Sequence, residues 1–155
     1  MSVNPLPPPR PSLKKFGKFP DSVGLRLVDW EMDRAVMEMD IGPEHLNGFG
    51  VVHGGAIMTL LDTACAHAGI YCTVPGNRRL GASVSLTINL IGNVKDGRLI
   101  AHAVCKRAGK TLFFSSCDVV DHAGNIIATG EAVCRYARGS EKPEGVPGHQ
   151  VTAPA

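Results

Sequence analysis

The chain has no long apolar run. No stretch of its 155 residues approaches the roughly 20 apolar residues that a membrane-spanning helix requires, and the N-terminus lacks the apolar core of a signal peptide. We therefore expect neither a membrane anchor nor a secretory leader. The sequence predicts a cytoplasmic protein without a membrane partner.

A strong charge of one sign is also missing. The 16 basic and 14 acidic residues leave a formal net charge of +2. A protein that neutralises many phosphates along a nucleic acid needs a larger basic excess, so we predict no nucleic-acid partner. A local basic cluster would still suffice for one anionic ligand.

The sequence lacks the residue spacing of a metal site. Its five cysteines are an odd number without a C-x-x-C pair, and most fall within apolar patterns, which predicts reduced core residues. The six histidines include no H-x-x-x-H pair. We therefore predict no catalytic metal.

At 155 residues, the chain is long enough for one domain with a substantial core and too short for two. Prolines concentrate at both ends: five lie within residues 1–12, and further prolines and glycines lie within residues 139–155. Both segments are expected to be mobile. The predicted domain therefore spans residues 13–138.

Apolar periodicity within that domain predicts one main helix and several strands. Residues 56–68 are apolar on nearly every helical face, which indicates a buried helix. From residue 83 to 90, polar and apolar residues alternate, as in a half-buried strand. Further elements are expected at 13–19 (a short helix), at 24–41 (a strand or a pair of strands), and at 98–107, 111–121 and 126–137 (strands).

Short links that contain glycine separate the later strands, at residues 95–97, 108–109 and 122–125. Such links are typical of β-hairpins, so these strands are predicted to form an antiparallel meander. A long apolar helix inserted before an antiparallel sheet must be covered by that sheet. This combination predicts an α+β architecture.

Residues with potential chemistry concentrate between positions 47 and 64. Asn47 precedes a turn-rich loop, and His53-Gly54-Gly55 leads into the predicted helix. Two adjacent glycines leave backbone N–H groups bare at a helix N-terminus, where they can stabilise a developing oxyanion. Asp62 lies about two turns further along, where a carboxylate among apolar neighbours is costly unless it has a role. This arrangement indicates an active site.

Each of these residues also has a purely structural interpretation. Asp62 could bond to a neighbouring threonine or face solvent at a subunit edge. His53 could be an ordinary loop histidine, and Asn47 followed by a glycine could simply form a turn. The residues alone leave both interpretations open.

The same residues carry a resemblance to a known family. Asn47, five intervening residues, His53-Gly54-Gly55 and an acid nine positions after the histidine form a pattern similar to that of the hotdog-fold acyl-CoA thioesterases of the PaaI type. The similarity continues through residues 81–89 and 107–111. It covers about residues 22–137 and leaves out both tails.

The resemblance implies a hotdog fold, in which an antiparallel sheet wraps around one long helix, and a thioester hydrolase. In that family the acid acts as the nucleophile or as the base that activates water, and here it would be Asp62. The N–H of Gly54 or Gly55 would polarise the thioester carbonyl. The implied supporting residues are His53 as an orienting group, Asn47 near the thioester or the attacking water, and Ser83 as a hydrogen-bonding neighbour of the acid.

The resemblance also implies a binding site for coenzyme A. Arg107, Lys110 and Thr111 flank a tight turn that the family uses to bind the phosphates of this group. A charged hairpin tip is otherwise usually just solvated. Because coenzyme A is part of the acyl-CoA substrate, no separate cofactor is expected.

A site shared between subunits is a further implication of the resemblance. One chain would supply Asn47, His53 and Gly54-Gly55, while Asp62 would reach in from its partner. A homodimer is then the smallest active unit. A homotetramer, formed by two such dimers, is an alternative.

Two other activities and the identity of the acyl group stay open. A hotdog hydratase or dehydratase would move a proton on an enoyl or hydroxyacyl thioester, although the acid on the helix argues against it. A noncatalytic acyl-CoA-binding protein is the second alternative. A pocket lined by Met58, Leu61 or Phe49 would suit an aromatic or medium-chain acyl group. Besides Arg107 and Lys110, the sequence contains a second, weaker basic pair, Arg78-Arg79.

Overall fold

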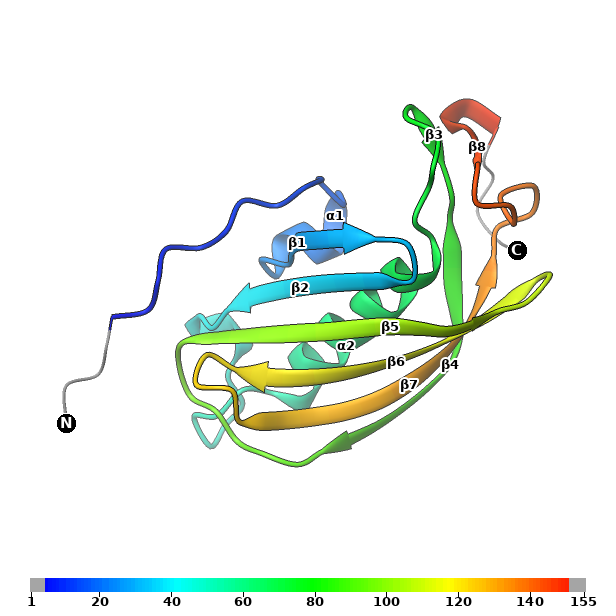
Figure 1. Cartoon of the computed structure of the whole chain (residues 1–155). Coiled ribbons are helices and arrows are strands. Elements are labelled where there is room, and N and C mark those ends of the chain that lie inside the picture. The colour runs from blue at the N-terminus through cyan, green and yellow to red at the C-terminus, as the bar shows by residue number, and fades with distance from the viewer. Residues whose placement is uncertain (1–4, 151–155) are drawn as a thin grey trace.

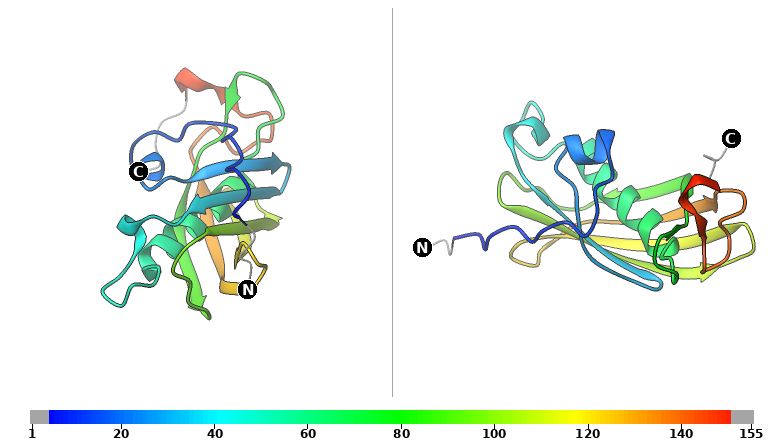
Figure 2. Two further views of the ribbon diagram at one scale, coloured as in Figure 1. Left: turned by 90° about the vertical axis from the view of Figure 1, so that its left-hand side faces the viewer. Right: turned by 90° about the horizontal axis from the view of Figure 1, so that it is seen from above.

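The computed structural model describes residues 5–150, and its core is one 6-stranded antiparallel sheet that curves around a single long helix, α2 (Gly54–Gly69) (Figures 1 and 2). The strand order in the sheet is β1-β2-β5-β6-β7-β4. These strands are β1 (Arg26–Glu31), β2 (Arg34–Asp40), β4 (Gly81–Leu90), β5 (Arg98–Ala108), β6 (Leu112–Asp121) and β7 (Ile126–Tyr136). The smaller elements are α1 (Lys18–Ser22), the 3₁₀ turns Pro43–His45 and Gly148–Gln150, and a ribbon of β3 (Asn77–Arg78) and β8 (Val146–Pro147).

The apolar faces of α2 explain its central place. It begins two residues before the predicted range of 56–68 and ends one residue after it. Leu60, Leu61 and Ala64 are fully buried beneath the sheet. At the far end of the helix, a Cβ on Gly69 would collide with the ring of Phe113, so glycine allows α2 to approach β6 closely. Among the residues that the structure describes, no helix is both long and apolar enough to cross a membrane.

The N-terminal part of the domain differs in one element from the prediction. The short helix expected at 13–19 is found later, at Lys18–Ser22. The Asp21 carboxylate accepts hydrogen bonds from the N–H groups of Phe16 (3.2 Å) and Gly17 (2.8 Å), which keeps the chain before Lys18 out of the helix. The prediction of a helix at 13–19 was therefore wrong. The segment 24–41 forms a pair of strands, β1 and β2, which was one of the two predicted alternatives.

Three of the later strands form the predicted meander, because β6 pairs with β5 on one side and β7 on the other. The fourth does not: β4 pairs with β7, and β5 pairs with β2 along its first seven residues. The link at residues 95–97 is therefore a crossover, and its prediction as a hairpin was wrong. The chain does bend at Gly97, which has a φ of 91°, but local turn chemistry does not determine which strands become neighbours.

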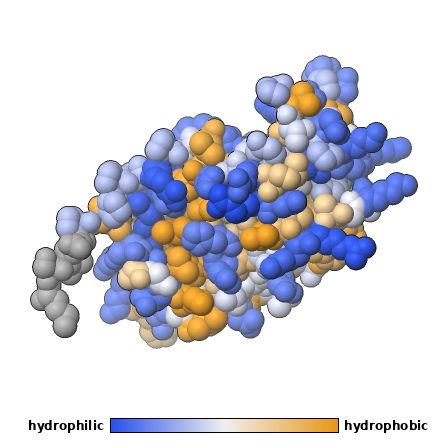
Figure 3. All heavy atoms as spheres, viewed as in Figure 1, coloured by the Kyte–Doolittle hydropathy of each residue, from blue (hydrophilic) through white to orange (hydrophobic). Residues whose placement is uncertain are grey.

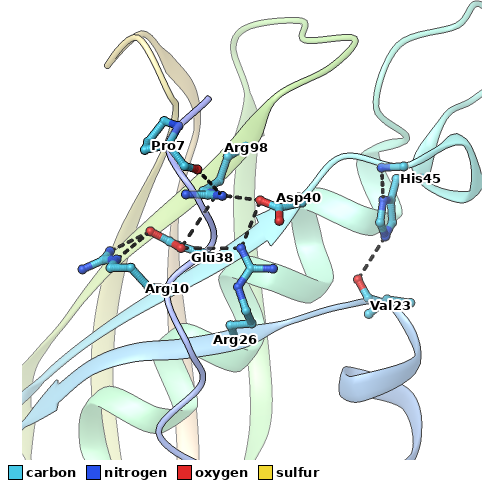
Figure 4. A network of polar contacts seen from close by, with 9 residues as sticks. Pro7, Arg10, Val23, Arg26, Glu38, Asp40, His45 and Arg98 are labelled. Carbon is cyan, nitrogen blue, oxygen red and sulfur yellow. Dashed lines mark hydrogen bonds and ion pairs between the residues drawn. The ribbon is translucent and has the colours of Figure 1, made fainter. Parts of the chain in front are cut away.

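The N-terminal arm contacts the outer face of the sheet through a network of charges (Figure 4). Glu38 of β2 is only 2% exposed, and its carboxylate accepts a hydrogen bond from Arg10 at 2.7 Å. Beside it, the Arg98 guanidinium donates to the Asp40 carboxylate at 2.6 Å and to the Pro7 carbonyl at 3.0 Å. The arm is thus attached to the sheet at Pro7 and Arg10.

The chain also continues to pack after residue 138. Ser140 is fully buried, and its hydroxyl donates to the Ala137 carbonyl at 2.9 Å. The buried Arg79 guanidinium donates to the carbonyls of Tyr71, Ser140 and Glu141. Mobility of the segments 1–12 and 139–155 stays a prediction, and residues 1–4 and 151–155 lie outside the described part of the chain.

Candidate active site

His53 begins α2 as its N-cap. Its backbone is extended (φ −65°, ψ 136°), and its Nδ1 accepts a hydrogen bond from the N–H of Gly55 at 2.8 Å. An accepting Nδ1 requires a ring that carries its proton on Nε2. A Cβ on Gly55 would lie 2.9 Å from that Nδ1, so a side chain there would disturb the cap. The His53 N–H donates to the His45 carbonyl at 2.8 Å, which holds the helix start in place.

Within residues 5–150, the cap leaves Gly54 as the free donor of the glycine pair. The sequence predicted that the N–H of Gly54 or Gly55 stabilises a developing oxyanion. The N–H of Gly55 is already hydrogen-bonded to Nδ1 of His53. The N–H of Gly54 stands in the first turn of α2, where no carbonyl of the helix can accept it. Its position combines a bare donor with the positive end of the helix dipole, which suits a developing negative charge.

Asn47 shapes the loop that precedes this helix start. Its side-chain oxygen accepts from the N–H of Phe49 at 2.9 Å and, less closely, from the N–H of Val51 at 3.4 Å. Leu46 and Val52 pair at the base of the loop. The turn predicted for Asn47 is therefore present, and its amide nitrogen makes no hydrogen bond within residues 5–150.

Asp62 and Ser83 meet across the gap between α2 and β4. The Ser83 hydroxyl donates a hydrogen bond to the Asp62 carboxylate, which is only partly buried. Ser83 also lies 3.8 Å from the Cys134 sulfur. A register shift in β4 between Ser83 and Ser85 turns the strand at this point. The predicted hydrogen bond between Ser83 and the acid is therefore present in the structure.

Two cysteines, Cys65 and Cys134, lie near the acid, which no sequence pattern indicated. Burial raises the pKa of the Cys134 thiol to about 11, and the hydrogen bond from Ser83 acts in the opposite direction. The pKa of Cys65 is also raised, first by its hydrogen bond with Cys117 and then by burial. These thiols stay protonated near neutral pH and are poor nucleophiles. Their apolar context was the only available signal, and it pointed correctly to the core.

Within one chain the helix start and the acid lie far apart. Nine residues separate His53 from Asp62, which corresponds to about 13 Å of rise and about two and a half turns of helix. The N–H of Gly54, the first residue of the helix, still lies about 12 Å along the helix axis from Asp62. A single chain does not bring the Gly54 N–H and the Asp62 carboxylate to the same carbonyl group.

The predicted coenzyme A residues lie together at the hairpin between β5 and β6. Arg107, Lys110 and Thr111 are exposed and line a surface hollow of about 480 Å³. No acidic side chain pairs with either cation in the described part of the chain. The hollow therefore offers uncompensated positive charge to an anionic group. Within residues 5–150, no three His, Cys, Asp or Glu side chains are grouped as a metal site requires.

Apolar side chains remain exposed along β4, which is an edge strand of the sheet. Val84 is 62% exposed and Ile91, just after the strand, is also 62% exposed. Phe49 and Met58, which were expected to line an acyl pocket, are exposed as well, whereas Leu61 is buried in the core. On the outer face of the sheet, apolar residues are interspersed with polar ones (Figure 3).

Comparison with known proteins places these features in context. A family model described as "Thioesterase superfamily" matches residues 49–128, which include the helix start, Asp62 and Ser83. Human acyl-coenzyme A thioesterase 13 is 34% identical over 108 residues, which cover 68% of this chain and 75% of that protein.

Solved structures agree on the fold. A conserved protein from Pseudomonas aeruginosa superposes with a TM-score of 0.69 and 22% identity, covering 77% of this chain and 94% of the other. A mutant of the phenylacetic acid degradation protein PaaI from Thermus thermophilus gives a TM-score of 0.63 and 20% identity, covering 75% and 96%. The predicted hotdog fold, with its sheet wrapped around one long helix, is confirmed.

Proposed function

Because this chain belongs to the thioesterase superfamily and is a PaaI-like thioester hydrolase, we propose that it hydrolyses an acyl-CoA to a free acid and coenzyme A. The similarity to human acyl-coenzyme A thioesterase 13 supports coenzyme A as the thiol part of the substrate. An aromatic or medium-chain acyl group is part of the proposal. So are a cytoplasmic location and the absence of a metal cofactor.

In the proposed reaction, the N–H of Gly54 donates to the thioester carbonyl oxygen and stabilises the oxyanion. Asp62 either attacks the carbonyl carbon, forming a mixed anhydride that water then hydrolyses, or removes a proton from a water that attacks directly. In both routes the carbon–sulfur bond breaks, water supplies the new acid oxygen, and the coenzyme A thiolate takes up a proton. Ser83 orients the carboxylate through its hydroxyl.

The observation that carries the proposal is the separation of the two halves of the site on α2. About 12 Å of helix rise lies between Gly54 and Asp62, and this separation supports a site in which the Gly54 N–H of one chain acts with Asp62 of another. The exposed edge of β4 beside Ser83 offers unpaired backbone groups and apolar side chains to a second copy. We therefore propose a homodimer as the smallest active unit, with a homotetramer as an alternative.

The direct test of this function is thiol release from a panel of acyl-CoAs. We expect free coenzyme A from phenylacetyl-, benzoyl-, hexanoyl- or octanoyl-CoA without added metal, at a rate that a chelator does not change. Abolition of turnover by EDTA with restoration by zinc would contradict the metal-free reaction. No turnover of any thioester would instead favour a noncatalytic acyl-CoA-binding protein.

The hairpin hollow leads to a prediction about the Michaelis constant. Changing Arg107 or Lys110 to alanine should raise KM for acyl-CoA and leave kcat nearly intact, because contacts with phosphates remote from the thioester bind substrate and transition state alike. Higher salt should have the same effect, since both side chains are exposed.

The control for this prediction is an acyl-pantetheine, which lacks the nucleotide phosphates. The two variants should hydrolyse it with the KM of the unmodified protein. An equal rise in KM for acyl-CoA and acyl-pantetheine would show that Arg107 and Lys110 do not bind the phosphates.

A further inference from the structure

A cavity of about 660 Å³ lies beside the C-terminal half of α2. Its walls come from the segment around Lys14 and Phe16, from Trp30 of β1 and from the loop that carries Arg78. None of the residues proposed above for hydrolysis or for phosphate binding lines it. The cavity therefore has no assigned occupant.

Two residues that line this cavity lie near Asp62 and Ser83. Ala66, which lines the cavity, follows Asp62 by four residues and lies on the same face of α2, about 6 Å away. Gly81 also lines it and precedes Ser83 by two residues on the same face of β4, about 7 Å away. A thioester held at Asp62 is thus one helical turn from the cavity.

Aromatic rings form one wall. The ring of His67 stands edge-on to Phe16, with 5.1 Å between centroids, and lies 5.7 Å from the indole of Trp30. Its Nδ1 lies 2.8 Å from the Thr63 carbonyl, and burial lowers the pKa of His67 to about 4. The histidine is therefore neutral near pH 7, and the wall is apolar and suits a hydrocarbon or aromatic chain.

Lys14 and Arg78 line the cavity, and neither has a counterion within residues 5–150. The Lys14 ammonium lies 5.2 Å from the centroid of Trp30, and both burial and the charge of Arg78 lower the pKa of Lys14. No Asp or Glu lines the cavity, and in the described part of the chain no acid pairs with either cation. The neighbouring Arg79 differs, because three backbone carbonyls occupy its guanidinium.

We propose that this cavity receives the acyl group of the substrate and selects one that ends in a carboxylate. The apolar part of the chain would pack on Phe16 and Trp30, and the terminal carboxylate would pair with Lys14 and Arg78. The charge of Arg78 lowers the pKa of Lys14, which shows that the two cations repel each other, and an anion between them would offset that repulsion. The inference rests on the proposed acyl-CoA hydrolysis and specifies its substrate.

The test compares acyl chains of equal length with and without the carboxylate. We expect the unmodified protein to hydrolyse adipyl-CoA with a kcat/KM at least roughly tenfold above that for hexanoyl-CoA, because a charge-assisted hydrogen bond contributes more than a neutral contact. In Lys14→Gln and Arg78→Gln, the ratio of the two kcat/KM values should fall by roughly tenfold. Lys18→Gln is the matched control, because it removes one exposed positive charge outside the cavity and should keep the ratio.

The corresponding pantetheine thioesters lack the CoA phosphates. They therefore distinguish the carboxylate of the acyl chain from the CoA phosphates as the group that Lys14 and Arg78 bind. If the variants lower the adipyl-to-hexanoyl ratio of kcat/KM for both the CoA and the pantetheine thioesters, the carboxylate of the acyl chain binds at Lys14 and Arg78. If the variants instead impaired every CoA ester equally and no pantetheine ester, these cations would bind the CoA phosphates, and the inference would be overturned. Equal hydrolysis of adipyl- and hexanoyl-CoA would also overturn it but leave the thioesterase function intact, whereas inactivity toward all thioesters would refute that function itself.

Discussion

Replacing Asp62 with asparagine should lower kcat by roughly a hundredfold or more, in the range expected for the loss of a positioned base or nucleophile. The asparagine oxygen can still accept the Ser83 hydrogen bond, so the local geometry should persist. The amide neither attacks a thioester nor takes a proton from water. The measurement is steady-state thiol release with the best substrate of the panel.

Two controls separate chemistry from folding in this experiment. Because Asp62 is only partly buried, Asp62→Asn should keep the circular dichroism spectrum and the melting temperature of the unmodified protein. Ser83→Ala removes the hydrogen bond that orients the carboxylate and should reduce kcat by less than Asp62→Asn does. Near-normal turnover in a folded Asp62→Asn protein would make the acid a structural residue.

The central helix and the chemistry around it could be predicted from the sequence because their signals are local. An apolar pattern on every face identified α2, and the glycine pair marked its start. Alternation identified β4, and the glycine-bearing turns at residues 108–109 and 122–125 identified the hairpins on both sides of β6. In each case the information lies within a few residues of the element.

Contacts between distant segments were not predictable in this way. The pairing of β4 with β7, rather than β5, depends on which faces the whole sheet buries, and no turn residue encodes it. The same holds for the cavity that joins Lys14 to Arg78, since these residues are 64 positions apart. The sequence showed a basic pair at Arg78-Arg79. It did not show that the Arg79 guanidinium is hydrogen-bonded to backbone carbonyls, whereas Arg78 lines the cavity without a counterion in the described part of the chain.

A mixed dimer should restore activity to two inactive variants if the site is shared. Asn47→Ala and Asp62→Ala, unfolded together and refolded, pair at random, so about half of the dimers contain one chain of each kind. Each mixed dimer rebuilds one intact site out of two, because the Asn47 of one chain meets the Asp62 of the other. We therefore expect activity to return to roughly a quarter of that of the unmodified protein.

The hydrogen bonds of the Asn47 side chain guide the choice of variants and controls for this experiment. Because the Asn47 oxygen holds its loop through two N–H groups, Asn47→Asp serves as a second variant that keeps an acceptor for these groups and replaces the amide donor with a charged oxygen. Mixing folded variants without denaturation should give little rescue if subunit exchange is slow. No recovery after refolding, with dimers confirmed by sizing and each variant shown to be folded, would mean that the site does not cross the interface. Because α2 holds its N-cap and Asp62 about 13 Å apart within one chain, such a result would mean that Asn47 and Asp62 do not act at the same carbonyl group.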